Sequence, residues 1–169
     1  ESGPVTLNME LEVGIQFAKM FGFNTDESKG VCAWGHLTSG GTNANYESLW
    51  NFRAAKFYPL AVANAVKELD LDLDLEIENS DFKNPKLYTL WELVNFSIER
   101  VLEFKNLVLT CTGSIYGKAK QSQLLKTIED NRIETLGPAQ FSAQNWQLKQ
   151  AVVLVPATAH YSWEKAMRV

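Results

Sequence analysis

Apolar residues recur at helical spacing along most of the chain. From Leu7 to Phe21 they repeat every three or four positions, and Gly22 follows as a stop signal. The same spacing predicts further helices over 43–58, 60–69, 88–94, 98–107 and 121–132, and one between Pro138 and Ala151. We expect the helix from 43 to end before Pro59, because proline lacks the backbone N–H that a helix interior uses.

Other stretches carry the patterns of β-strands. Val31–Trp34 and Ala151–Val155 are short apolar runs bounded by glycine or proline, as expected of buried strands. From Leu69 to Glu78 acids alternate with apolar residues, and this period of two predicts an extended, half-buried segment whose acids share one face. Short strands between amphipathic helices indicate an α/β fold.

The composition fits one compact domain and argues against several partners. The chain has 169 residues, 46% of them hydrophobic, and Lys+Arg 16 against Asp+Glu 20 give a net charge of −4. An acidic chain lacks the positive surface that nucleic acids and anionic membranes attract, so we expect no nucleic-acid partner and no membrane partner. No apolar run approaches the roughly 20 residues of a membrane span, and no signal peptide opens the chain, which favours a cytoplasmic protein.

The candidate metal ligands do not form a known site. Cys32 and Cys111 stand apart, without a Cys-x-x-Cys or Cys/His cluster, so we expect two thiols kept reduced in the cytosol. The acids of Asp70–Asp74 resemble the start of a calcium-binding EF-hand loop, but Leu75 stands where that loop needs glycine. We interpret them as a solvated acidic face and predict no metal.

Adjacent glycines stand before the predicted helix 43–58. At Gly40–Thr42 the backbone N–H groups can approach an anion at the positive end of this helix, so a phosphate group would fit there. The run Gly35–Thr42 is one residue short of a nucleotide-binding P-loop, and Gly41 stands where that motif requires lysine. A single phosphate monoester and a purely structural turn are both compatible with this pattern.

A histidine follows the last predicted strand. His160 comes after Ala151–Val155 and before a helical pattern, and the carboxyl end of a strand is where open α/β sheets bind ligands. Its imidazole could stack on an aromatic ring or move protons near neutral pH. A histidine that serves only the structure is the alternative, and the local sequence does not decide between the two.

Two separated motifs together resemble one known family. The first motif is Gly35–Asn45 with Glu47–Trp50 and Arg53, and the second is Val155–Pro156 with His160–Trp163 and Lys165–Ala166. In this order they resemble the group II pyridoxal-phosphate-dependent amino-acid decarboxylases. The Trp-Gly-His sequence of Trp34–His36 and the Trp-Glu-Leu sequence of Trp91–Leu93 resemble the branch of bacterial tyrosine decarboxylases. The resemblance covers essentially the whole chain.

The resemblance implies a pyridoxal 5'-phosphate cofactor and assigns residues to it. Gly41 and Thr42 match the positions that bind the cofactor phosphate, and His160 matches the histidine that stacks on the pyridine ring and assists catalysis. The family also implies the large domain of fold type I enzymes, which has a mainly parallel sheet flanked by helices. It further implies a homodimer and release of carbon dioxide from an amino acid such as tyrosine or glutamate. His36 matches a histidine of the tyrosine branch, for which the sequence indicates no role.

Two groups that the family needs have no match in this chain. The family's Schiff-base lysine and the aspartate beside the pyridine nitrogen lie after the His-Tyr-Ser segment, and no lysine here, Lys165 included, matches the Schiff-base position. The sequence also starts without Met and ends in a helical pattern. We therefore expect residues 1–169 to be a single-domain fragment of the large domain, truncated at both ends and inactive by itself.

Functions from other classes stay open beside this one. A truncated or decayed copy could serve as a non-catalytic remnant or interaction module, which a gene without the downstream lysine and aspartate would favour. A degenerate P-loop nucleotide binder is disfavoured by the glycine at position 41. Hydrolysis by serine and histidine is weaker still, because no Gly-x-Ser-x-Gly elbow is present.

Overall fold

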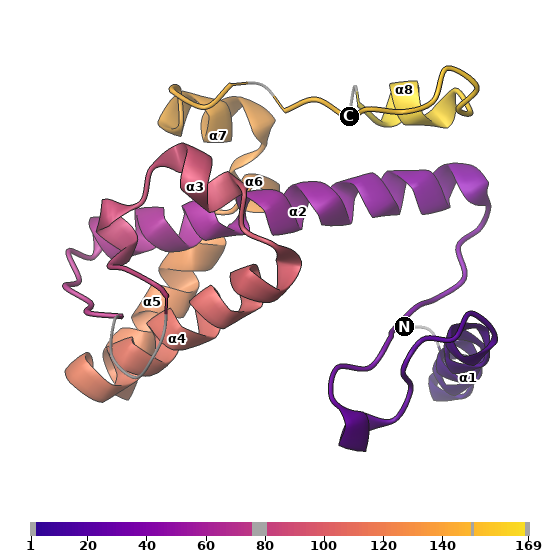
Figure 1. The fold of residues 1–169 in the computed structure, drawn as a ribbon, viewed down its shortest axis with the longest axis horizontal. Helices are drawn as coiled ribbons and strands as arrows, with labels where there is room; N and C mark the ends of the chain where they lie inside the picture. The colour runs from indigo at the N-terminus through magenta and orange to yellow at the C-terminus, as the bar shows by residue number, and fades with distance from the viewer. Residues whose placement is uncertain (1–2, 76–80, 150, 168–169) are drawn as a thin grey trace. The chain divides into compact units, whose positions relative to one another are not determined.

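A computed structural model describes residues 3–75, 81–149 and 151–167. Over these residues the chain folds into α-helices and short 3-10 helices joined by irregular segments (Figure 1). In chain order the elements are α1 (Pro4–Met20), η1 (Glu27–Lys29), α2 (Gly41–Glu68), η2 (Pro85–Leu87), α3 (Leu90–Val94), α4 (Ile98–Tyr116), α5 (Lys118–Asp130), α6 (Ile133–Leu136), α7 (Pro138–Gln144) and α8 (Ser162–Ala166).

The α/β fold expected from the sequence is wrong, because the described residues contain no strand. A strand is stable only when neighbouring strands accept and donate its backbone hydrogen bonds. In the described chain no strand lies beside Ala151–Val155, whose side chains are exposed, Leu154 to 94%. Val31–Trp34 is irregular as well, and its Ala33 N–H donates to the Asn24 carbonyl at 2.8 Å. A helical architecture therefore replaces the mainly parallel sheet flanked by helices.

The acidic alternating segment is half-buried without being a strand. The leucines of Leu71–Leu75 are at most 1% exposed, whereas the aspartates between them are exposed. The Tyr116 hydroxyl accepts a hydrogen bond from the Asp72 N–H and donates to the Asp72 carbonyl, each at 3.1 Å. The predicted two-sided pattern is confirmed as far as Leu75, and positions 76–78 lie outside the described residues.

Pro59 does not end a helix, contrary to the sequence prediction. The predicted helices 43–58 and 60–69 are one helix, α2, with Pro59 in its interior. A proline inside a helix costs about 3 kcal/mol, since one hydrogen bond is lost and the ring clashes with the preceding turn. Leu60, Ala61 and Val62 are fully buried immediately after it. Burial of this apolar stretch is the tertiary contribution that overrides the local preference.

The chain divides into two compact units. We call the first the motif unit, because it contains Gly35–Asn45 and His160–Trp163; it comprises the chain up to Ser48 and the chain from Thr158 onward. We call the second, Leu49–Ala157, the core unit. Cys32 and Cys111 belong to different units and are not joined by a disulfide.

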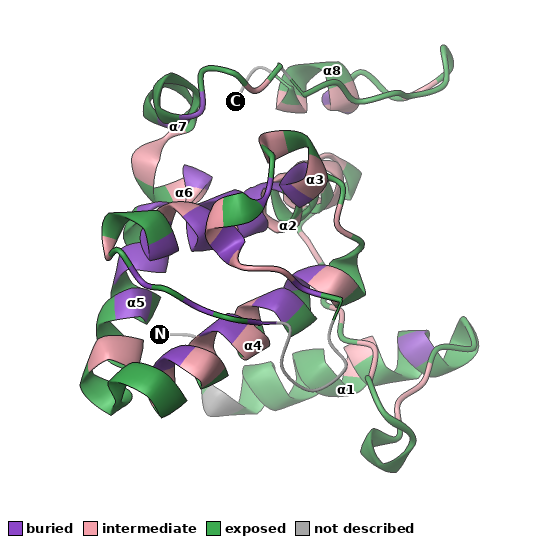
Figure 2. Ribbon diagram, turned by 60° about the vertical axis from the view of Figure 1, so that its left-hand side comes forward, coloured by how far each residue is buried: buried purple, intermediate pink, exposed green. Residues whose placement is uncertain are grey.

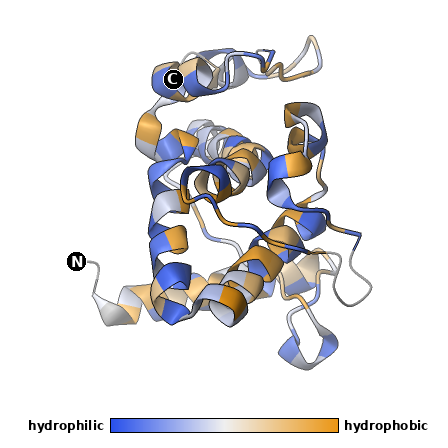
Figure 3. Cartoon of the chain, turned by 90° about the vertical axis from the view of Figure 1, so that its left-hand side faces the viewer, coloured by the Kyte–Doolittle hydropathy of each residue, from blue (hydrophilic) through white to orange (hydrophobic). Residues whose placement is uncertain are grey.

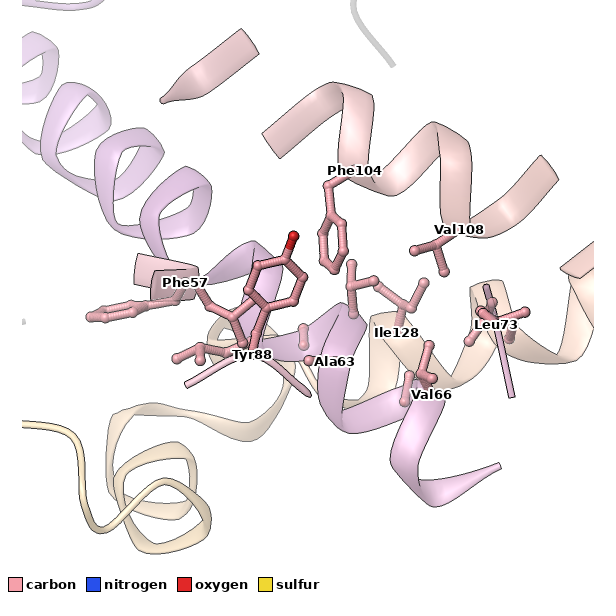
Figure 4. Packing of buried hydrophobic residues seen from close by; sticks show 14 of the residues in the cluster. Phe57, Ala63, Val66, Leu73, Tyr88, Phe104, Val108 and Ile128 are labelled. Atoms are coloured by element: carbon pink, nitrogen blue, oxygen red, sulfur yellow. The ribbon is translucent and has the colours of Figure 1, made fainter. Parts of the chain in front are cut away.

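The core unit holds the hydrophobic core. Ala63 and Val66 of α2, Phe104 and Val108 of α4, and Ile128 of α5 converge in one buried cluster (Figure 4). The helices α4 and α5 lie side by side as a hairpin (Figure 1). Hydrophobic and hydrophilic residues are interspersed along the helices (Figure 3), as expected when each helix buries one side only.

The motif unit buries little of its own surface. Among the residues whose side chains are described there, only Ala18 and Ser162 are buried, at 7% and 0% exposure. The helix α1 is exposed along most of its length (Figure 2), and its Leu7, Ile15 and Phe17 are all more than 40% exposed. The unit that carries the motifs is therefore the one with almost no core.

Candidate functional site

The predicted phosphate-binding turn lies at the N-terminus of α2. Gly40 has a φ of 155°, which L side chains rarely adopt, and its carbonyl accepts the first helical hydrogen bond from the Ala44 N–H at 3.1 Å. The Thr38 hydroxyl donates to the same carbonyl at 2.9 Å. Asn43 donates from its side chain to the Ser39 hydroxyl. The turn is thus shaped by its own side chains.

Gly41 and Thr42 are the first two residues of α2. The N–H groups of a first helical turn have no intrahelical acceptor. A Cβ at Gly41 would meet nothing within 4 Å, and Gly41 has no positive φ, so neither packing nor conformation in the described chain requires glycine there. A ligand that approaches the backbone closely would require it. These N–H groups and the Thr42 hydroxyl, at the positive end of a 28-residue helix, fit a phosphate.

His160 is connected to α2 through Ser162. The Ser162 Oγ lies 2.9 Å from Nδ1 of His160. The same Oγ accepts a hydrogen bond from Nδ2 of Asn45 at 2.8 Å, across 117 positions of the sequence. Ser162 is fully buried, whereas His160 is exposed. The structure therefore attaches the second sequence motif to the helix that begins in the first.

Asn45 shares a side of α2 with the predicted phosphate-binding positions. Gly41 and Thr42 precede it by four and three residues, and side chains at these spacings lie on one helix face with Cβ atoms about 5–6 Å apart. The segment that carries His160 is fastened one helical turn beyond Gly41. The three residues that the sequence assigns to the cofactor, Gly41, Thr42 and His160, are thus brought to the same end of α2.

The imidazole of His160 has one occupied and one open nitrogen. Nδ1 faces Ser162, and no described residue forms a hydrogen bond with Nε2. The ring lies 4.2 Å from that of Tyr161, between centroids, at an interplanar angle of 42°. The Lys165 ammonium lies 4.6 Å from the centroid of the Tyr161 ring, a cation–π contact. The open Nε2 is the part of the residue that remains for a ligand.

His36 has a structural role that the sequence did not indicate. Its Nε2 lies 2.7 Å from Oε2 of Glu47, in the second turn of α2. Its ring lies 5.2 Å from the ring of Trp34. These contacts tie the loop before Gly40 to the helix after it. His36 and Trp34 also line a pocket of about 220 Å³ with Leu7, Glu10, Leu11 and Gly35, which includes neither Gly41 nor His160.

The described residues offer nothing for a metal or a membrane span. No group of three or more histidine, cysteine, aspartate or glutamate side chains is arranged there to hold a metal ion. Of the helices in the described chain, none combines the length and the apolarity needed to cross a membrane. The chemistry available at the site is therefore that of backbone N–H groups, hydroxyls, an amide and an imidazole.

Sequence reasoning assigned Gly41, Thr42 and His160 to the candidate site but missed the Asn45–Ser162 contact that joins the two motifs. Asn45 and Ser162 stand in the two motifs, but the sequence assigns neither of them to the cofactor. The spacing alone places Asn45 on the same helix face as Gly41, because it stands one helical turn after it. Nothing in the sequence alone pairs Asn45 with Ser162.

The chain was compared with known proteins. No family model matches it, and no solved structure matches it. It is 30% identical over 170 residues to the L-tyrosine decarboxylase of Enterococcus faecium, a match that covers 100% of this chain and 21% of the relative. The L-tyrosine decarboxylases of Levilactobacillus brevis and Enterococcus faecalis are each 30% identical to it as well, over 98% of this chain and 20% of their own length.

The chain spans about a fifth of the length of the curated relatives that it matches. Within that fifth the match is almost complete along this chain, so it includes both motifs and the long segment between them. The resemblance drawn from the motifs is confirmed. Over essentially its whole length, the chain is similar to about a fifth of these L-tyrosine decarboxylases.

Proposed function

We propose that the chain is part of a pyridoxal-phosphate-dependent L-amino-acid decarboxylase, a carboxy-lyase that releases carbon dioxide and an amine from tyrosine or a related amino acid such as glutamate. The observation that carries the proposal is the Asn45–Ser162 hydrogen bond of 2.8 Å, which holds the His160 segment beside the end of α2. At that end Gly41 and Thr42 offer donors to a phosphate. The names of the relatives support decarboxylation and tyrosine as the substrate.

The residues of the motif unit have different roles in this proposal. The N–H groups of Gly41 and Thr42 and the Thr42 hydroxyl bind the phosphate of the cofactor. His160 would pack its imidazole against the ring of the bound cofactor, and its Nε2 would remain available for a hydrogen bond. Bound pyridoxal phosphate supplies a conjugated ring that withdraws electrons from the bond to the departing carboxylate. Asn45 and Ser162 keep His160 in place.

The chain alone has no decarboxylase activity in this proposal, because none of its lysines matches the family's Schiff-base position. The small buried surface of the motif unit supports a larger protein around it, since only Ala18 and Ser162 are buried there among the described side chains. We propose that the whole enzyme is a cytoplasmic homodimer that acts on a small-molecule amino acid, without nucleic acid and without a membrane.

Sequencing the coding template beyond Val169 is the first experiment. An aspartate in an Asp-x-Ala context followed by a lysine is the expected result, and the full-length product should then release carbon dioxide from L-tyrosine. A reading frame that closes at Val169 would instead favour the non-catalytic remnant. Carbon dioxide release by residues 1–169 alone would contradict the proposed inactivity of the chain.

Binding of the phosphate can be measured on this chain without the rest of the enzyme. Pyridoxamine 5'-phosphate is the suitable probe, because it lacks the aldehyde that would react with surface lysines. We expect line broadening of its ring-proton NMR signals on addition of the chain, and no broadening of the signals of pyridoxamine, which lacks the phosphate. Equal binding of both compounds would refute phosphate recognition at Gly41 and Thr42, and competition by ATP at low concentration would favour the nucleotide binder instead.

A further inference from the structure

The hydroxyl of Ser162 is held on two sides within the motif unit. Nδ2 of Asn45 lies 2.8 Å from its Oγ, and the Oγ lies 2.9 Å from Nδ1 of His160. The backbone N–H of Ser162 also donates to this Nδ1, at 3.3 Å. Since Ser162 has no exposed surface, water does not compete for its hydroxyl, and Asn45 and His160 account for one accepted and one donated hydrogen bond.

The direction of each hydrogen bond follows from the backbone. A peptide N–H can only donate, so the Nδ1 that receives the Ser162 N–H carries a lone pair and no proton. The Ser162 hydroxyl must then donate its one proton to the same Nδ1. Its oxygen is left as an acceptor, which the amide N–H of Asn45 satisfies. All donors in the series point toward His160, and this also fixes the orientation of the Asn45 amide.

We propose that Asn45 and Ser162 are positioning residues that hold His160 as the neutral tautomer with its proton on Nε2. The imidazole then presents a hydrogen-bond donor at its open nitrogen, and it cannot accept a proton there. Two donors on Nδ1 also limit rotation of the ring. The role of this donor beside a bound cofactor or amino acid rests on the proposed function, whereas the tautomer is a property of the chain itself.

Nitrogen NMR of the imidazoles tests the tautomer directly. The chain has two histidines, so a long-range proton–nitrogen spectrum of protein labelled with nitrogen-15 histidine contains two imidazole patterns, and His36→Gln assigns them. In mildly alkaline solution we expect His160 to show a bare Nδ1 and a protonated Nε2. A proton on Nδ1, or nitrogen shifts equal to those of free histidine, which samples both tautomers, would overturn the proposal.

Variants test whether Asn45 and Ser162 fix the tautomer of His160. Ser162→Ala and Asn45→Ala should each move the His160 nitrogen shifts toward those of free histidine, and Ser162→Thr, which keeps a hydroxyl, should restore them. Asn43→Ala is the matched control, because Asn43 stands two residues from Asn45 but donates to Ser39. Unchanged His160 shifts in both alanine variants would overturn the assignment of Asn45 and Ser162.

His36 reports whether a variant still folds. Its contact with Glu47 lies in the same unit, so an unchanged His36 pattern shows that the motif unit is intact. If a variant also loses the His36 pattern, it is unfolded, and the imidazole spectrum of the unmodified chain alone then tests the tautomer. The result is independent of the proposed function, because no cofactor is present; failure of pyridoxamine 5'-phosphate to bind would refute the function and leave the tautomer standing.

Discussion

Gly14 of α1 lies directly against the carbonyl oxygen of Gly35, so closely that a Cβ at position 14 would overlap that oxygen. Both residues belong to the motif unit. In an ordinary helix interior, alanine is more stable than glycine by roughly 0.5–1 kcal/mol. At Gly14 we expect alanine to be less stable than glycine, because the added Cβ forces the backbone of the loop away from the helix.

We therefore predict that Gly14→Ala destabilises the contact between α1 and the loop by about 1–3 kcal/mol, the usual cost of overpacking. Faster amide hydrogen exchange across α1 and the segment before His36 is the readout. Gly3→Ala is the control, since a Cβ there meets nothing within 4 Å and its φ is −58°. Equal exchange in both variants would show that the close approach does not exist in solution.

A second prediction concerns the stability of the core unit at acidic pH. Lys83 Nζ, the Thr89 N–H and the Thr89 hydroxyl donate to the Glu92 carboxylate at 2.6, 2.7 and 2.8 Å. With the hydrogen bond from Lys83 as the largest cause, these contacts lower the pKa of Glu92 from 4.5 to about 2. A pKa that is lower in the folded state means that the carboxylate stabilises the fold above about pH 4.5, and that this contribution disappears as the pH falls toward 2.

Glu92→Gln should accordingly lower the melting temperature of the core unit at neutral pH, and the difference from the unmodified chain should vanish near pH 2. Glu103→Gln, at an exposed glutamate of α4, serves as the control and should change little at either pH. Thermal unfolding followed by circular dichroism provides the comparison. A difference for Glu92→Gln that is independent of pH would contradict the origin of the stabilisation in the ionised carboxylate.

Phe104 should be a main contributor to the stability of the core unit. It is fully buried, and its ring centroid lies 5.4–5.7 Å from those of Phe82, Tyr88 and Phe96. Phe104→Ala should reduce the free energy of unfolding by about 3–5 kcal/mol, because the cavity left behind cannot close completely. Leu102→Ala on the same helix is the control: Leu102 is 53% exposed, and chemical denaturation should show a loss below about 1 kcal/mol.

Gly41→Val should abolish phosphate recognition without unfolding the chain. A Cβ at position 41 meets nothing within 4 Å in the chain itself, whereas a ligand that approaches the backbone closely would conflict with the side chain. The dissociation constant for pyridoxamine 5'-phosphate should rise at least about tenfold, equivalent to about 1.4 kcal/mol. Gly3→Val adds the same side chain at a position with equally open surroundings and should bind as the unmodified chain does. If Gly41→Val keeps the affinity for pyridoxamine 5'-phosphate, the phosphate does not bind at Gly41.

In the full-length enzyme, His160→Ala should reduce turnover much more than cofactor content. In the proposed function, the N-terminal end of α2 holds the phosphate, whereas His160 contributes its ring and its Nε2–H. Turnover of L-tyrosine and the absorbance of the bound cofactor measure the two effects on the same preparation. Unchanged turnover would remove His160 from the mechanism.

Local sequence signals predicted most helices. The pattern from Leu7 with the stop at Gly22 matches α1, and Ser97 caps α4 by accepting from the Arg100 N–H at 3.3 Å. The errors have a common cause. Pro59 and the apolar run Ala151–Val155 were assigned from local preference, but tertiary burial keeps α2 continuous, and an isolated run has no neighbouring strand in the described chain to pair with.

The candidate site could be proposed from the sequence where it depends on short motifs. Gly41 and Thr42 follow from the physics of a helix N-terminus, and the family resemblance adds His160. Asn45 and Ser162 were not predictable, because their hydrogen bond joins residues 117 positions apart and each is an ordinary polar residue in its own neighbourhood. Only the folded chain shows that one amide connects the two motifs.

The core unit occupies the sequence between the two parts of the motif unit and has a hydrophobic core of its own. Insertions and deletions on its surface are therefore free to accumulate without altering the residues that Asn45 and Ser162 contact. The number of residues between Gly41 and His160 can therefore change during evolution while the Asn45–Ser162 hydrogen bond is kept. Distant homologues should be sought by the two motifs in order, with no fixed spacing between them.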